Sequence, residues 1–338
     1  MRQVITEEPG AGQLRSAGRL ASQEDRLVGL HIRVAYSGEP GAFAEDAMLA
    51  YFGGAGRGAT GAPDGAPLPG FRQVFEAVTE GQLESDTPDA ALIEAGVLPI
   101  ENVVNGTVRE VYDLLLEFDL VITGEVVVPV HLCLAALPGQ SLEQIERVYS
   151  HIQALGQSEA FLRRRPWSLL TTYNTAGAAK LIAERDERGA AAVLSPRAAA
   201  LFGLEILADP VQDVPDNRTR FLVLERPAEA GGGAEGATRP GPAGTQGPRS
   251  AAHPMRTTLV FGTPNEPGSL HRLLGILAGA GLNMSKLESR PLRGRPWEYV
   301  FWAELDADAA DPATAAALGD LRAAATMLRV LGSYPRAE

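Results

Sequence analysis

The sequence predicts a large α/β region followed by a smaller ferredoxin-like domain, and three observations support this. Between residues 31 and 226, short β-branched or apolar segments alternate with helical segments, which indicates an α/β domain with a largely parallel sheet. Residues 227–255 are rich in Gly, Pro and Ala and lack large apolar side chains, as in a flexible linker. Residues 256–335 follow the order βαββαβ, the ferredoxin-like pattern.

The polar first 30 residues are expected to form a flexible extension. With 338 residues the chain has room for about two domains, and 45% hydrophobic with 21% charged residues is ordinary globular composition. The net charge of −12 and the absence of a basic stripe argue against a nucleic-acid partner. Neither a secretory signal nor a long apolar run is found, so we expect a cytoplasmic protein without a membrane partner.

The sequence contains no recognisable metal or disulfide pattern. The single cysteine, Cys133, has no partner for a disulfide or a zinc site, and its apolar neighbours predict a buried thiol. The five histidines are scattered along the chain. We therefore expect neither a metal nor a cofactor.

Individual elements of the α/β region can be placed from local patterns. Strands are expected at residues 32–36, 92–100 and 121–130, a helix at 42–52, and an exposed loop in the Gly-rich residues 53–70. Capping boxes predict helix starts at Thr107, Ser141 and Ser150, and a Ser-Pro pair predicts another at Ser195.

Three of five chemically suggestive segments lie in the first half of this region. Residues 36–43 pass from a strand through glycines to a helix, so Ser37 and the free N–H groups could bind an anion. In residues 98–107 a strand delivers Glu101 and Asn102 to a loop, and Gly106 and Thr107 open a helix. In residues 150–157, Gln153 and Gln157 lie four positions apart on one helix face.

The other two segments lie further along. In residues 173–179, Asn174 or Thr175 can cap a helix whose first turn, from Ala176 onward, is small enough for a ligand to approach. Residues 217–221 combine Asn217, Thr219, Arg220 and Phe221, and an arginine can bind a carboxylate through two hydrogen bonds. Each segment alone is equally compatible with an ordinary turn, helix cap or solvated face.

Together and in this order, the five segments resemble the prephenate dehydratase family over residues 34–226. The motifs are Gly38-Glu-Pro-Gly-Ala-Phe43, Pro99-Ile-Glu-Asn102 with Gly106, His151-Ile-Gln-Ala-Leu-Gly-Gln157, Thr175-Ala-Gly-Ala-Ala179 and Asn217-Arg-Thr-Arg-Phe221. The last domain resembles an ACT domain, with Pro264-Asn-Glu-Pro-Gly-Ser-Leu270 and Glu288-Ser-Arg-Pro291 as effector motifs. Val103, Ile152 and Ser158 depart from the Ser, Pro and Cys that are usual in the family.

The resemblance implies two α/β lobes similar to periplasmic binding proteins, with the chain crossing between them near residues 107–121 and returning near 204–211. It implies conversion of prephenate to phenylpyruvate, carbon dioxide and water without cofactor or metal. Thr219 would donate to the leaving hydroxyl and Arg220 would hold a carboxylate, beside Asn217 and Phe221. The residues implied to bind substrate are Ser37, Glu101, Asn102, Gly106, Gln153, Gln157, Thr175 and Ala176.

The ACT resemblance implies feedback regulation by phenylalanine and a homodimer or homotetramer. The implied effector site consists of Asn265, Pro267, Gly268, Ser269, Leu270, Asn283, Met284, Glu288, Ser289, Arg290 and Pro291. We also expect the region before the linker to work alone after deletion of residues 227–338. Two alternatives stay open: an arogenate dehydratase that makes phenylalanine directly, and a non-catalytic amino-acid-sensing protein.

Overall fold

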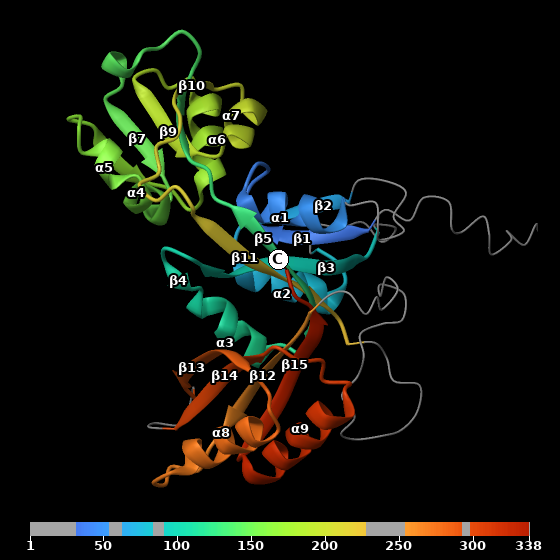
Figure 1. The fold of residues 1–338 in the computed structure, drawn as a ribbon. Coiled ribbons are helices and arrows are strands. Elements are labelled where there is room, and N and C mark those ends of the chain that lie inside the picture. The colour runs from blue at the N-terminus through green and yellow to red at the C-terminus, as the bar shows by residue number, and fades with distance from the viewer. Residues whose placement is uncertain (1–31, 54–62, 84–90, 228–253, 293–297, 338) are drawn as a thin grey trace, which may run out of the picture.

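The computed structural model describes residues 32–53, 63–83, 91–227, 254–292 and 298–337, which form three parts of the molecule (Figure 1). Two α/β lobes precede a four-stranded domain. The N-terminal extension and almost all of the expected linker lie outside the described residues. No helix among the described residues is long and apolar enough to span a membrane.

The first lobe is built on a mixed sheet of order β2-β1-β3-β11-β5, with β4 paired to β3. Strands β2 and β3 run parallel to β1, whereas β11 is antiparallel to both β3 and β5. The strands are β1 (Arg33–Ser37), β2 (Asp64–Leu68), β3 (Ile93–Asn102), β4 (Gly106–Thr107), β5 (Val121–Pro129) and β11 (Arg218–Glu225). One face packs on α1 (Phe43–Phe52), and the other on α2 (Phe71–Glu80) and α3 (Arg109–Glu117).

The second lobe has a mixed sheet of order β10-β6-β9-β7-β8. Its strands are β6 (Cys133–Ala136), β7 (Arg147–Ser150), β8 (Ser168–Thr171), β9 (Ala190–Leu194) and β10 (Glu205–Ala208). Its helices are η1 (Leu142–Gln144), α4 (Ile152–Gln157), α5 (Glu159–Leu162), α6 (Thr175–Arg185) and α7 (Pro196–Leu201). The predicted α/β class is thus confirmed, although both sheets are mixed rather than largely parallel.

The crossings between the lobes lie at residues 130–132 and 211–217, so their predicted positions were wrong. Helix α3 and strand β5 both belong to the first lobe, which moves the first crossing beyond Pro129. The two crossing segments, together called the interlobe connection, are hydrogen-bonded to each other. The Val130 N–H donates to the Asn217 carbonyl at 2.7 Å, and the Val211 N–H to the Leu132 carbonyl at 2.8 Å.

Several local expectations also changed. Residues 64–68 form the edge strand β2 instead of a loop, because β1 offers a backbone partner and an edge strand tolerates Pro67. The Ser141 capping box is present, and Ser195 caps α7. Helix α3 instead begins after Val108, with Thr107 in β4, and α4 is capped by His151 while the Ser150 hydroxyl donates to the Val193 carbonyl.

The last domain has the expected βαββαβ order and an antiparallel sheet of order β13-β14-β12-β15. Its elements are β12 (Met255–Gly262), α8 (Ser269–Gly279), β13 (Met284–Pro291), β14 (Tyr299–Leu305), α9 (Pro312–Ala324) and β15 (Met327–Pro335). Helices α8 and α9 cover one face of this sheet. The other face lies against α3 and β5 of the first lobe (Figure 1).

This contact forms a hydrophobic core shared by the two domains. Trp302 is 2% exposed and packs edge-on against Tyr112, with ring centroids 4.7 Å apart. Leu331 and Tyr334 join the same core. A side chain at Gly332 would place its Cβ 2.1 Å from the Ile122 carbonyl oxygen, so the sheet can approach this closely only with a glycine there.

The shared core argues against our expectation that the region before the linker would work alone. A chain ending at residue 226 would expose Tyr112 and its apolar neighbours to water, at a cost proportional to the exposed area. We predict that it melts at least about 10 °C below the full-length protein or fails to stay in solution. Thermal denaturation followed by circular dichroism would measure this, and an unchanged melting midpoint would contradict it.

Candidate functional site

A cluster of three side-chain amides joins the two lobes. Asn102 ends β3, Asn217 precedes β11, and Gln157 ends α4 of the second lobe. Asn102 Nδ2 donates to Asn217 Oδ1 at 2.8 Å, and Asn217 Nδ2 donates to Gln157 Oε1 at 2.9 Å. We call these three residues the amide cluster. Asn102 and Asn217 are buried, so the cluster is a fixed polar wall rather than a solvated surface.

Thr219 completes this wall. Its Oγ1 accepts a hydrogen bond from Asn102 Nδ2 at 2.9 Å, and the residue is 9% exposed. A hydroxyl that accepts from an amide keeps its own hydrogen for another acceptor. Among the described residues, the Thr219 hydroxyl is recorded only as an acceptor.

The start of α4 depends on an unprotonated imidazole. His151 Nδ1 accepts the Gln153 N–H at 3.3 Å, and the helix then delivers Gln157 to the amide cluster. Burial lowers the pKa of His151 below its ordinary value. Gln153 itself is exposed, and its side chain makes no hydrogen bond to the described residues, unlike that of Gln157.

Two helix N-termini meet where the lobes face each other. Ser37 ends β1 just before the glycine turn that leads into α1, whose first residue has no side-chain cap. Thr175 and Ala176 open α6, and the side chain of Asn174 caps it through the Gly177 N–H at 2.6 Å. Free N–H groups at such positions attract anions. At α1 the Glu45 carboxylate already accepts the Gly41 N–H at 2.7 Å, so the first N–H groups of α6 are the more open of the two sets.

The same ends of α1 and α6 are tied across the lobes by a set of contacts that we call the interlobe clamp. Glu39 accepts from the Tyr173 hydroxyl at 2.6 Å and pairs with Lys180 at 3.2 Å. Arg197 bridges from α7 to Glu45 at 2.6 Å and Asp46 at 2.8 Å. Sequence inspection missed these four contacts, because no local motif links residues more than 100 positions apart.

Three of the expected site residues lie elsewhere. Phe221 is 2% exposed in the core between α1 and the sheet. Arg220 and Glu101 face the last domain, where Arg220 binds Glu101, Glu125 and Glu304 at 2.7–2.9 Å. Successive side chains of a strand point to opposite faces, so Arg220 cannot share the face of Thr219. The structure thus places the side chains of these three residues away from the amide cluster.

Two departures from the family pattern are compatible with this site. The Val103 side chain is 65% exposed and its N–H donates to the Arg218 carbonyl at 3.0 Å, a bond open to any residue but proline. Ile152 is 62% exposed at the start of α4. Gly106 pairs with Asn102 in the β3–β4 hairpin instead of opening a helix.

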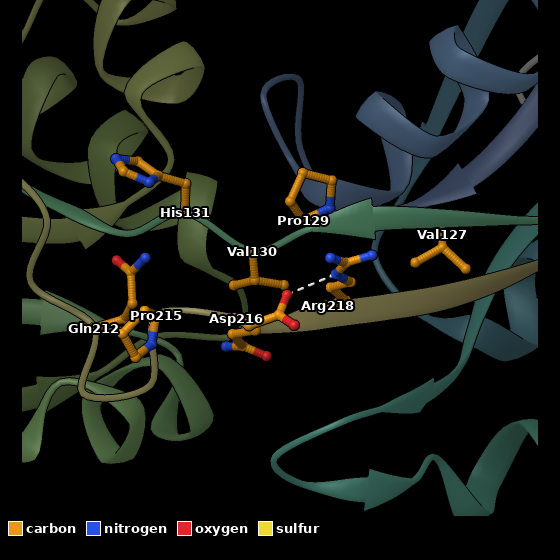
Figure 2. A pocket seen from close by; sticks show the side chains of 9 residues that line it. Val127, Pro129, Val130, His131, Gln212, Pro215, Asp216 and Arg218 are labelled. Atoms are coloured by element: carbon orange, nitrogen blue, oxygen red, sulfur yellow. Dashed lines mark hydrogen bonds and ion pairs between the residues drawn. The ribbon is translucent and has the colours of Figure 1, made fainter. Parts of the chain in front are cut away.

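A hollow of about 360 Å³ lies along the interlobe connection (Figure 2). It is lined by Val127, Pro129, His131 and Arg218, among others, and Asp216 holds Arg218 at 2.7 Å. Val127 and Pro129 alternate along β5 with Val128, which packs beneath α1. The hollow therefore lies beside β5 on the face opposite Thr219 and reaches Asn217 of the amide cluster. Among the described residues no group of histidine, cysteine or carboxylate side chains is arranged to hold a metal ion.

The second of the two implied effector motifs, residues 288–291, contacts the first lobe. Glu288 Oε2 accepts from the Thr107 hydroxyl at 2.7 Å, and Arg290 pairs with Asp113 at 2.7 Å. Ser289 and Pro291 are the alternate residues at the end of β13. The other implied effector residues lie at the two ends of α8. Asn265 and Pro267 precede its N-cap, Gly268, which has φ 79°, and Ser269 and Leu270 are the first two residues of the helix. Asn283 and Met284 follow the helix.

The fold and site define a two-lobed α/β protein with an amide-lined site between its lobes and an ACT-type domain docked on one lobe. Comparison with known proteins places it more narrowly. Residues 34–229 match the family model for prephenate dehydratase and residues 257–323 that for the ACT domain. The chain belongs to the prephenate dehydratase family.

Similar proteins agree with this placement. Arogenate dehydratase/prephenate dehydratase 2 of Arabidopsis thaliana is 37% identical over 316 residues, covering 91% of this chain and 74% of that one. A prephenate dehydratase from Arthrobacter aurescens, solved in complex with L-Phe, superposes with a TM-score of 0.72 at 29% identity, covering 90% of each chain. A quorum quenching acylase, GqqA, gives a TM-score of 0.72 at 31% identity, covering 90% and 97%.

The His151 cap generates a pH prediction. Because folding depresses its pKa, the cap stabilises the protein above the unfolded value of about 6.5, and this is lost as the pH falls through the folded value. We expect turnover to fall with protonation of this group in the wild type. His151→Asn keeps a capping acceptor that does not titrate, and should flatten that limb of the pH–rate profile. Identical profiles for both proteins would show that His151 does not control the site.

Proposed function

We propose that this chain performs the dehydration and decarboxylation of prephenate with Thr219 as the donor to the leaving hydroxyl. The observation that supports this most strongly is the Thr219 hydroxyl, whose oxygen is held by Asn102 while its hydrogen is available. The ring C–O bond breaks as the ring carboxylate leaves as carbon dioxide, and the electrons of the broken C–C bond complete the aromatic ring. The departing hydroxide takes a proton through Thr219, which regains one from solvent.

The thermodynamic drive lies in the substrate, since the product ring is aromatic. The protein must therefore orient a dianion and stabilise departing charge. Threonine is a weak acid, so its donation has to be concerted with C–O cleavage. With Arg220 engaged elsewhere, the N-termini of α1 and α6 and the amide of Gln157 are the groups we propose for the carboxylates and the ring.

Replacing Thr219 tests this role. Thr219→Ala removes the donor and should lower kcat by about 10²–10³-fold, the usual loss for one transition-state donor. Thr219→Ser keeps a hydroxyl and should retain most of the activity. Phenylpyruvate formation from prephenate, followed by absorbance in alkali, measures both variants. Near-native turnover of Thr219→Ala would exclude Thr219 as the donor.

The substrate can also be arogenate, which carries an amino group in place of the side-chain keto group. The Arabidopsis relative is named for both activities. We propose prephenate as the preferred substrate, and a comparison of kcat/KM for the two compounds decides between them. The acylase likeness is less well supported by the site, because the partner of Thr219 is an amide and not the general base that a nucleophilic hydroxyl requires.

We further propose that phenylalanine binds the ACT domain and inhibits the reaction, and that the domains assemble as a homodimer or homotetramer. The contact from Glu288 to Thr107 supports a route to the site, because Thr107 and Gly106 form the strand that pairs with Glu101 and Asn102. An effector that moves β13 would therefore act on the hairpin ending at Asn102. Sedimentation of the full chain with and without phenylalanine measures the assembly.

Removing the Thr107 hydroxyl tests the route. In Thr107→Val, phenylalanine should still bind, but at least about fivefold more should be needed for half inhibition, because allostery is a coupling free energy between sites. Thr123→Val, which also removes a side-chain hydrogen bond but one within the first lobe, is the matched control. Calorimetry and inhibition curves on the full chain separate binding from coupling, and unchanged inhibition in Thr107→Val would exclude this route.

A further inference from the structure

Six charged side chains meet at the contact between the first lobe and the ACT domain. Glu101, Glu125 and Arg220 come from the lobe, and Arg256, Lys286 and Glu304 come from the ACT domain. We call them the six-charge cluster. Arg220 lies at its centre: Nη1 donates to Glu125 at 2.9 Å and Nη2 to Glu101 at 2.9 Å, while Glu304 receives one bond from each, at 3.0 and 2.7 Å.

The cluster is neutral and largely buried. Three carboxylates balance two guanidinium groups and one ammonium, with Arg256 2.7 Å from Glu125 and Lys286 3.0 Å from Glu101. The Arg220 side chain is 11% exposed, Glu304 8% and Glu125 1%. Burial alone would lower the pKa of Arg220, but the carboxylates of Glu304 and Glu125 outweigh it and raise that pKa. The guanidinium is thus fully engaged with protein.

The same two strands carry this cluster and the site on opposite faces. In the pairing of β3 with β11, Arg220 is opposite Glu101, and Thr219 is opposite Asn102. Alternation puts the first pair toward the ACT domain and the second toward the amide cluster. The register shifts immediately after Arg220, where β11 departs from regular pairing with β3. The pairing of the same residues with β5 stays regular, so the extra residue lies in β3. Arg220 adds side-chain contacts from β11 to the ACT domain at this irregular point of the β3–β11 pairing.

We infer that Arg220 is a positioning residue, and that Glu304 of the ACT domain completes its hold on β11 and thereby orients Thr219. The two hydrogen bonds from the Arg220 guanidinium to the Glu304 carboxylate fix the plane of the guanidinium. Without the two bonds to Glu304, Arg220 no longer ties β11 to the ACT domain next to Thr219. A donor misplaced by about 1 Å can cost about 10²-fold in rate. This inference rests on the proposed function, since it assumes that Thr219 acts on the substrate.

Glu304→Gln is the informative variant, because Glu304 lies on the face away from the site and cannot touch the substrate. We expect kcat for prephenate to fall by about tenfold or more with KM changed less than about twofold, since transition-state geometry is lost while substrate binding remains. Glu304→Asp keeps the charge with a shorter reach and should lie between wild type and Glu304→Gln. It also serves if Glu304→Gln does not fold.

Asp113→Asn is the matched control. It removes a carboxylate from another contact of the same 2.7 Å length between lobe and ACT domain, but one on α3 rather than β11. Its kcat should stay at the wild-type value. A double-mutant cycle combines Arg220→Lys with Glu304→Gln. The kcat of the double variant should be no lower than that of Arg220→Lys alone, because both changes break the same contact between Arg220 and Glu304.

The outcomes are distinct. Equal kcat values for Glu304→Asp, Glu304→Gln and Asp113→Asn, or a rise in KM without loss of kcat, would overturn the positioning role. Additive effects in the cycle would show that the two residues act separately and would also overturn it. A wild-type protein without dehydratase activity on either substrate would instead contradict the proposed function.

Discussion

The antiparallel pairing of β3 with β11 is the contact on which the rest of the molecule depends. One face of the pair presents Asn102 and Thr219 to the region between the lobes, and the other presents Glu101 and Arg220 to the ACT domain. Because the side-chain period of a strand is two, both faces are set by one register. A slip of one residue would exchange a hydroxyl for a guanidinium at the site and bury the hydroxyl among carboxylates.

The charges of the molecule are used locally. With a formal charge of −12 the protein does not attract a dianion at long range, so recognition falls to N–H groups and amides at short range. Two cationic side chains of this region are paired within the protein. Arg220 contacts the carboxylates of Glu101, Glu125 and Glu304, and Lys180 contacts Glu39. Losing one member of the buried set around Arg220 costs about 3–5 kcal/mol, whereas the complete set adds little net stability. The complete set around Arg220 instead fixes the relative positions of the strands that carry it.

Much of the fold could be predicted from local patterns. The ferredoxin-like order and strands β1, β3 and β5 follow from periodicity. Asn102, Gln157, Asn217 and Thr219 were singled out because each lies in a short local motif. Local motifs do not show that strand alternation directs Arg220 and Glu101 to the face opposite Thr219. They also do not show that Phe221, on the same face as Thr219, is buried beneath α1. Contacts such as Arg220 to Glu304, 84 positions apart, leave no local signal. The start of α3 was misjudged because strand pairing with Glu101 overrides the capping preference of Thr107.

The place of β11 in the sheet has a consequence for how the chain folds during synthesis. The second lobe is continuous from β6 to β10 and has its own core, so it can form as soon as it emerges. The first lobe cannot close, because β11 lies between β3 and β5 and begins 89 residues after the end of β5 (129 to 218). Until then β3 and β5 both present unpaired backbone edges, which is where a nascent chain aggregates or recruits a chaperone. The second lobe can therefore be complete on the ribosome before β11, the strand that the first lobe needs between β3 and β5, has been made.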